Sequence, residues 1–145
     1  MIAGGLPTRI YYASQGGYDT HNNQLATHER LMTELGDSLA AFAKDLQQQG
    51  NFNRVTLMTF SEFGRRVVQN GSNGTDHGAA SPMFIMGGSV KAGLYGKYPS
   101  LTDLHDNDLI FNTDFRSVYA TLLDHWLKAP SKTILGRQFP TLSMV

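Results

Sequence analysis

Three polar stretches of this sequence contain side chains that commonly bind metal ions. Asp19 and His21 follow a glycine pair, Glu62 follows an apolar run, and Asp76 and His77 are adjacent between two glycines. On extended backbone, residues two apart point to the same side, so Asp19 and His21 can both reach one ion. Carboxylate and imidazole together are a common ligand set for zinc, iron and manganese. The residue types therefore predict a metal site, provided that the fold brings the three stretches together.

The histidine-containing stretches also have structural interpretations. The residues around Asp19 are typical turn formers, so its carboxylate can simply cap the segment that follows. Asp76 and His77 fit a solvated loop equally well. If they do form a site, either both ligate, or His77 ligates while Asp76 fixes its tautomer.

Two acidic features outside the histidine stretches remain open. Glu62 is expected to be desolvated at the end of a buried strand and to need a positive partner, which Arg65, Arg66 or a metal ion can supply. Taken alone, the ion pair is the favoured interpretation. The acidic stretch over residues 102–108 could hold calcium, but it lacks the spacing and glycine of an EF-hand loop, which favours a solvated turn.

Composition excludes several classes of function. The 145 residues include no cysteine, and 12 basic residues balance 12 acidic ones. Thiolate ligands and a cysteine nucleophile are therefore excluded, and nothing indicates a nucleic-acid partner. No apolar run approaches the roughly 20 residues of a transmembrane segment, and no signal peptide is visible in this chain. No Gly-x-Ser-x-Gly elbow or phosphate-binding P-loop is present, so no nucleophile is evident.

The elements that must position these residues follow from hydrophobic spacing. Residues 9–14 are aromatic and β-branched and predict a buried strand. Helical spacing of apolar residues predicts a helix over residues 24–49, with Asn22 or Asn23 as cap. The apolar run over residues 55–60 predicts a strand covered on both faces. Two strands joined by such a helix form a parallel crossover unit, with polar loops at the ligand-binding edge of the sheet.

The second half adds further elements. After a polar loop over residues 69–78, a third strand is expected over residues 81–86 and a short hairpin arm over residues 90–95. A second helix is expected to begin near Thr113, and the tail from Lys128 is expected to be mostly loop. The fold class is therefore α/β, with a mostly parallel sheet flanked by helices. Two helices do not cover both faces of such a sheet, so the sheet looks incomplete.

The motifs together resemble a bacterial family. They are Gly-Gly-Tyr-Asp-Thr-His, Ser-Glu-Phe-Gly-Arg-Arg, Gly-Thr-Asp-His-Gly and Thr-Asp-Phe-Arg-x-Val-Tyr. In this order they resemble the C-terminal part of the family catalogued as domain of unknown function 1501. That family in turn resembles the alkaline phosphatase and sulfatase superfamily. The resemblance implies that residues 1–145 are a single domain, the C-terminal part of a larger alkaline-phosphatase-like domain with a partial sheet.

The superfamily's metal-binding pattern can be placed on this chain in two ways. An acid and a histidine at one strand end match Asp19 and His21. The next part of the pattern is an acid–histidine pair after a second strand, and Asp76 and His77 match it by residue type. Strand order instead places this pair at Glu62 and Phe63, and His77 then matches the pattern's final histidine, before a third strand. We favour the assignment by strand order. One metal ion then keeps three ligands, whereas a second ion loses a ligand at Phe63.

The resemblance also implies a function. The expected protein is the metal-site portion of a hydrolase acting on phosphate or sulfate esters, inactive as an isolated chain because the nucleophile lies elsewhere. Its divalent ion would be zinc, calcium or manganese, bound or oriented by Asp19, His21, Glu62, Asp76 and His77. Arg65 would contact the substrate anion. The implied location is periplasmic or secreted, by twin-arginine export, and a possible partner is the remaining N-terminal portion of the same domain. The alternative is a non-catalytic binding or cell-surface assembly module on the same fold.

Overall fold

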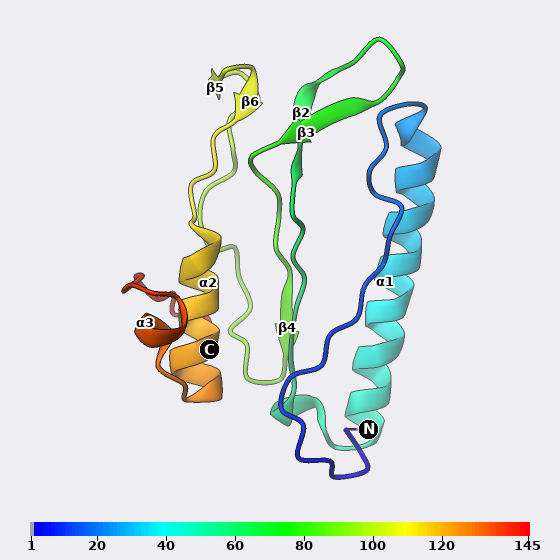
Figure 1. The fold of residues 1–145 in the computed structure, drawn as a ribbon. Coiled ribbons are helices and arrows are strands. Elements are labelled where there is room, and N and C mark those ends of the chain that lie inside the picture. Colours follow the sequence, from blue (N-terminus) through cyan, green and yellow to red (C-terminus); the bar gives the residue numbers. More distant parts are fainter. Residues whose placement is uncertain (1) are drawn as a thin grey trace.

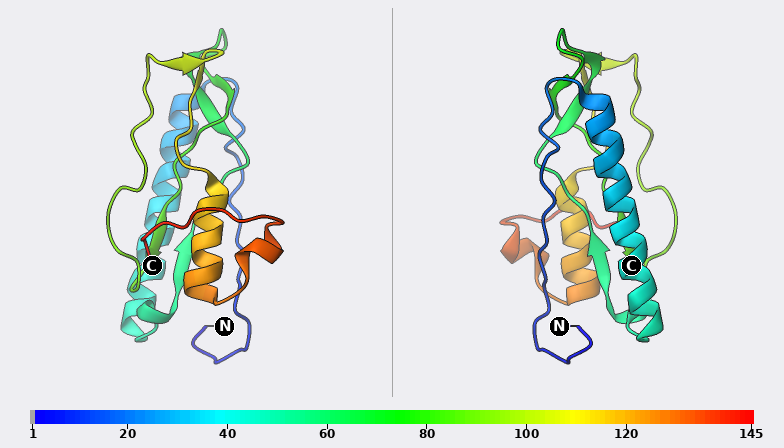
Figure 2. Two further views of the ribbon diagram at one scale, coloured as in Figure 1. Left: turned by 90° about the vertical axis from the view of Figure 1, so that its left-hand side faces the viewer. Right: turned by 90° about the vertical axis from the view of Figure 1, so that its right-hand side faces the viewer.

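A computed structural model describes residues 2–145 as two helical layers with short antiparallel ladders between and beyond them (Figure 1). The long helix α1 lies on one side and α2 on the other, with the β1–β4 ladder between them. Two further ladders gather at one end of the molecule, as both views in Figure 2 show. In chain order the elements are α1 (Gln24–Gln48), η1 (Phe52–Arg54), β1 (Thr56–Met58), β2 (Gly64–Gln69), β3 (Thr75–Gly78), β4 (Ile85–Gly87), β5 (Leu104–His105), β6 (Asp108–Leu109), α2 (Phe115–Thr121), the π-helix η2 (Leu122–Leu127) and α3 (Ser131–Ile134).

The helix predicted over residues 24–49 is confirmed as α1, within one residue at its end. Its apolar spacing buries Leu31 and Leu46 against the rest of the chain. Asn23 precedes the helix in a left-handed conformation, but its side chain forms no capping hydrogen bond. Instead, the backbone N–H groups of Asn23 and Gln24 donate to the carbonyls of Ser72 and Asn73. The start of α1 is therefore held by the turn between β2 and β3.

Strand pairing differs from the predicted parallel crossover. Each of the three ladders in the described residues has two antiparallel strands: β1 with β4, β2 with β3, and β5 with β6. The polar loop over residues 69–78 is mostly the β2–β3 hairpin, whereas no strand forms in the hairpin arm expected over residues 90–95. Polar sequence rich in Gly and Asn is as typical of a hairpin turn as of a loop, which explains why a hairpin forms where a loop was expected. The wider prediction of a partial alkaline-phosphatase-like sheet stays a prediction.

The strand predicted over residues 9–14 is wrong as a strand. These residues are extended, but they form no ladder. High β-propensity describes side chains that suit a pleated surface, and it becomes a strand only when a neighbour supplies the hydrogen bonds. The other two predicted strands, over residues 55–60 and 81–86, form in part as β1 and β4. These two strands pair with each other.

The second predicted helix is confirmed as α2 and its continuation η2. Its cap is Asp114 rather than Thr113, since the Asp114 carboxylate accepts a hydrogen bond from the backbone N–H of Arg116. The C-terminal tail, expected to be mostly loop, adds the short helix α3 and folds back to bury Phe139 and Met144. None of the described helices combines the length and apolar character needed to cross a membrane.

Candidate metal centre

Three potential ligand atoms converge at one point. Oδ1 of Asp19 lies 2.7 Å from Nε2 of His77 and 3.0 Å from Nε2 of His21. The two imidazole nitrogens lie 3.2 Å apart. Among residues 2–145, this is the one group of three or more such side chains with converging ligand atoms. The fold thus brings together residues that lie more than 50 positions apart in the sequence.

The size of this triangle suits a coordination sphere. With zinc–ligand bonds of about 2.0–2.1 Å, neighbouring ligand atoms lie about 2.9 Å apart in an octahedron and about 3.3 Å apart in a tetrahedron. The observed sides of 2.7–3.2 Å span the octahedral value. For a tetrahedral site the shortest side must open by about 0.6 Å. Two imidazoles with one carboxylate favour zinc, iron or manganese over calcium, which prefers oxygen ligands.

Hydrogen bonds alone can also explain the short distances, if both Nε2 atoms carry protons that point at Asp19. The surroundings of His21 favour the other tautomer. Its Nδ1 lies 3.3 Å from Oδ1 of Asp76, which suits an Nδ1–H donor. A neutral ring then directs the Nε2 lone pair at the Asp19 carboxylate, where a cation at the centre of the triangle would offset the repulsion.

Both carboxylates of the site are held in the charged form. The pKa of Asp19 lies below its usual value, chiefly because of the hydrogen bond from His77. The pKa of Asp76 is also lowered, first by the hydrogen bond from Asn70 and then by that from His21. A group with a depressed pKa stays ionised at neutral pH, so the site presents negative charge to any cation that approaches.

Arg65 ties the two halves of the site together. Asp19 and His21 lie in the irregular segment that precedes α1, whereas His77 lies on β3. Nη1 of Arg65 donates to the carbonyl of Thr75 at 2.7 Å, and Nη2 donates to the carbonyl of Tyr18. These two carbonyls directly precede Asp76 and Asp19 in the sequence. Arg65, which was predicted to contact a substrate anion, therefore also positions the ligand residues. The sequence did not indicate this second role.

A close backbone approach also fixes His21. The amide of Asn70 donates to the carbonyl of His21 at 3.0 Å. A Cβ atom added to Gly74 would lie 2.3 Å from the carbonyl carbon of His21. Only glycine fits this contact, which explains why the hairpin turn carries a glycine directly before the strand of His77.

Phe63 contacts the candidate metal centre although its side chain cannot bind a metal ion. Its ring stacks on that of His77, with centroids 3.8 Å apart and an angle of 4° between the planes. The guanidinium carbon of Arg65 lies 5.0 Å from the centroid of the same ring. Phe63 therefore sets the plane of the His77 imidazole. In the sequence, the only sign of this role was an aromatic residue next to Glu62, a predicted site residue.

The remaining predicted residues lie around the triangle. Asp76 contacts His21 rather than its neighbour His77. Glu62 is exposed, and among residues 2–145 no ion pair joins it to Arg65 or Arg66. The expected desolvation of Glu62 is wrong because β1 ends at Met58, four residues earlier.

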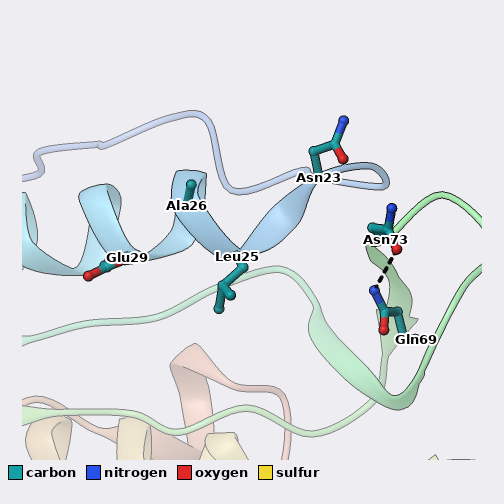
Figure 3. Close-up of a pocket in the computed structure, with 6 residues that line it drawn as sticks. All are labelled: Asn23, Leu25, Ala26, Glu29, Gln69 and Asn73. Atoms are coloured by element: carbon teal, nitrogen blue, oxygen red, sulfur yellow. Dashed lines mark hydrogen bonds between the residues drawn. The ribbon is translucent and has the colours of Figure 1, made fainter.

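Two open pockets lie away from the triangle. One, of about 420 Å³, lies between the start of α1 and the β2–β3 turn (Figure 3) and is lined by Asn23, Leu25, Ala26, Glu29, Gln69 and Asn73. Its single ionisable group offers no acid–base pair. The other, of about 280 Å³, includes Asp106 and Asp108 from the acidic stretch. There the Asp108 carboxylate accepts hydrogen bonds from the N–H groups of Ala79 and Leu109, as expected of a structural turn.

Comparison with known proteins identifies one family. The model of the family described as "Protein of unknown function (DUF1501)" matches residues 8–142, which is nearly the whole chain. No curated protein matches the chain, and no solved structure matches it.

Proposed function

The chain belongs to the DUF1501 family, and we propose that it binds one divalent metal ion, zinc or manganese, through Asp19, His21 and His77. The observation that carries the proposal is the convergence of one carboxylate oxygen and two imidazole nitrogens within 3.2 Å of one another. Asp76 orients His21 through Nδ1, and Phe63 orients His77 by stacking. Glu62 is not assigned to this ion.

The proposed role of the site is to bind phosphate or sulfate esters. A bound divalent ion would supply positive charge to hold the anionic oxygens of the ester. Three protein ligands leave coordination positions free. The side chains of Asp19, His21 and His77 are 45–66% exposed, so an ester in solution can reach them. Arg65 links the segment of Asp19 to the strand of His77, and its other N–H groups, which make no hydrogen bond within residues 2–145, can contact the anion.

The choice of ester hydrolysis rests on the resemblance to the alkaline phosphatase and sulfatase superfamily. The proposed hydrolysis uses a nucleophile from outside residues 1–145, so the chain alone is expected to bind anions without turning over esters. Periplasmic or secreted location belongs to the same proposal. The N-terminal portion of a larger domain is the proposed source of the nucleophile.

A non-catalytic binding or assembly module is the second candidate. Phe63 favours it, because a phenyl ring stands where the superfamily pattern places a second histidine. That ring removes a ligand from a second ion, so the pattern supports one ion rather than a two-metal site. On this alternative the fold serves binding or assembly, metal does not raise the thermal stability of the chain, and Asp19→Ala and His77→Ala leave partner binding intact.

Calorimetric titration of inorganic phosphate and sulfate into the chain tests the proposal. The metal-free chain, the zinc-loaded chain and a zinc-treated His77→Ala variant should be compared. Metal-dependent anion binding that His77→Ala abolishes supports the hydrolase proposal. Zinc binding without anion binding overturns the ester-binding role, and an absence of zinc binding overturns the metal site and favours the module.

A further inference from the structure

The segment over residues 9–14 is a strand without a partner. It runs extended along α1 and past the β1–β4 ladder (Figures 1 and 2). Within residues 2–145, no backbone hydrogen bond joins residues 6–17 to any other part of the chain. The side chains of Ile10 and Tyr12 are 71% and 75% exposed. Strand-forming residues with free N–H and C=O groups are a template for pairing with another strand.

The β1–β4 ladder has open edges as well. It contains two strands, so each strand has one edge with unpaired backbone groups. The large side chains of Phe60 and Phe84, next to these strands, are exposed. The rings of Tyr12 and Phe60 have centroids 6.0 Å apart, which places the segment and the ladder on one continuous surface. We call residues 9–14, β1 and β4 the acceptor surface.

The total surface area indicates how much is left to cover. A folded monomer of 16.0 kDa is expected to expose about 7,400 Å². This chain exposes 10,038 Å², which is roughly 2,600 Å² more than that expectation. An excess of this size corresponds to one side of a large obligate interface. The excess belongs to the whole chain, and the exposed apolar side chains of the acceptor surface contribute to it.

We propose that the acceptor surface binds a second polypeptide segment of different sequence, which adds at least one extended strand with apolar residues on both faces. Backbone hydrogen bonds to residues 9–14 would supply part of the affinity, and apolar contacts with Ile10, Tyr12 and Phe60 the rest. Exposure on both faces of residues 9–14 matches a strand meant to be buried on both sides.

A second copy of this chain fits the surface less well. A two-fold contact uses the same edge of both copies, so it pairs one edge of residues 9–14 and leaves the other open. The antiparallel edges of β1 and β4 also stay unpaired in such a dimer. The proposed strand addition does not depend on the metal site, which lies in the irregular segment before α1 and on β3.

A labelled octapeptide of valine and threonine with terminal lysines serves as the probe. Its binding to the whole chain is measured by fluorescence anisotropy. The control is the same peptide with N-methyl groups on alternate residues, which keeps the side chains and removes half of the donors. We expect the N-methylated peptide to bind at least about tenfold more weakly, the loss of more than one net hydrogen bond.

Two variants at one position complete the test. Tyr12→Pro removes a backbone N–H that makes no hydrogen bond within residues 2–145, whereas Tyr12→Thr keeps it. Binding that falls at least about tenfold in Tyr12→Pro and only a few-fold in Tyr12→Thr supports strand addition. Three results would overturn it: equal binding of both peptides, binding of neither, or a dimer by light scattering that Tyr12→Pro dissociates.

Discussion

Replacing Arg65 separates the role of the metal ligands from the role of the residue that positions them. Its guanidinium donates to the carbonyls of Tyr18 and Thr75, each one residue before a carboxylate of the site. A hydrogen bond from a charged donor contributes about 1.5–3 kcal/mol to stability. Arg65 is half-buried, so solvent replaces part of this. Arg65→Ala should therefore lower the free energy of unfolding by about 2–3 kcal/mol, less than the sum of two full bonds.

The same change should weaken metal binding although all three ligands remain. Partners that orient metal ligands typically contribute about 10–100-fold to affinity. We expect zinc affinity to fall by that factor in Arg65→Ala and by less in Arg65→Lys, because one amine reaches one carbonyl. Zinc titration calorimetry and urea denaturation in chelator measure the two effects.

Arg30→Ala is the matched control, because Arg30 forms only an exposed ion pair with Glu34 on α1. It should change zinc affinity little. If Arg65→Ala loses stability but keeps the zinc affinity of the unmodified chain, the positioning role is refuted. If it keeps both, the two hydrogen bonds contribute nothing measurable.

Four further variants concern the supports of the site and the fold. Asp76→Asn weakens the orientation of His21 and should lower zinc affinity by about tenfold in calorimetry, and unchanged affinity would contradict that role. Gly64→Ala places a Cβ 1.8 Å from the carbonyl oxygen of Ala80 and should cost about 3 kcal/mol in urea denaturation. Gly36→Ala, with open space around it in α1, should instead stabilise by about 0.5–1 kcal/mol. Asp114→Ala removes the cap of α2 and should cost about 1 kcal/mol at neutral pH. The hydrogen bond with Arg116 lowers the pKa of Asp114, so the stability contributed by the carboxylate is lost as pH falls through the lowered pKa. A stability difference between Asp114→Ala and the unmodified chain that persists in acid would contradict this prediction.

Local patterns predicted the helices well and the strand pairing poorly. The spacing that buries Leu31 and Leu46 lies within one helix, so sequence alone locates α1. Pairing depends on which strand comes near, and no local pattern records that. The chain leaves β1, forms the β2–β3 hairpin and returns as β4, which makes the β1–β4 pair antiparallel. Residues 9–14 have the composition of a strand without a neighbour to complete it.

The ligands of the candidate site were easier to predict than their supports. Asp19, His21 and His77 stand out because carboxylates and imidazoles are common metal ligands, although turns and solvated loops also contain them. The contact of Asp76 with His21 depends on how the hairpin docks on the start of α1, which the sequence does not show. The same holds for Arg65 and Phe63, which act through carbonyls and a ring face rather than through ligand atoms.

Calorimetric titration of zinc into the metal-free chain tests the central claim most directly. We expect one ion per chain, and loss of that binding in Asp19→Ala, His21→Ala and His77→Ala. His105→Ala and His125→Ala, which remove histidines outside the triangle, should bind zinc as the unmodified chain does. An absence of stoichiometric binding, or binding that survives His77→Ala and disappears in a control variant, would contradict the claim.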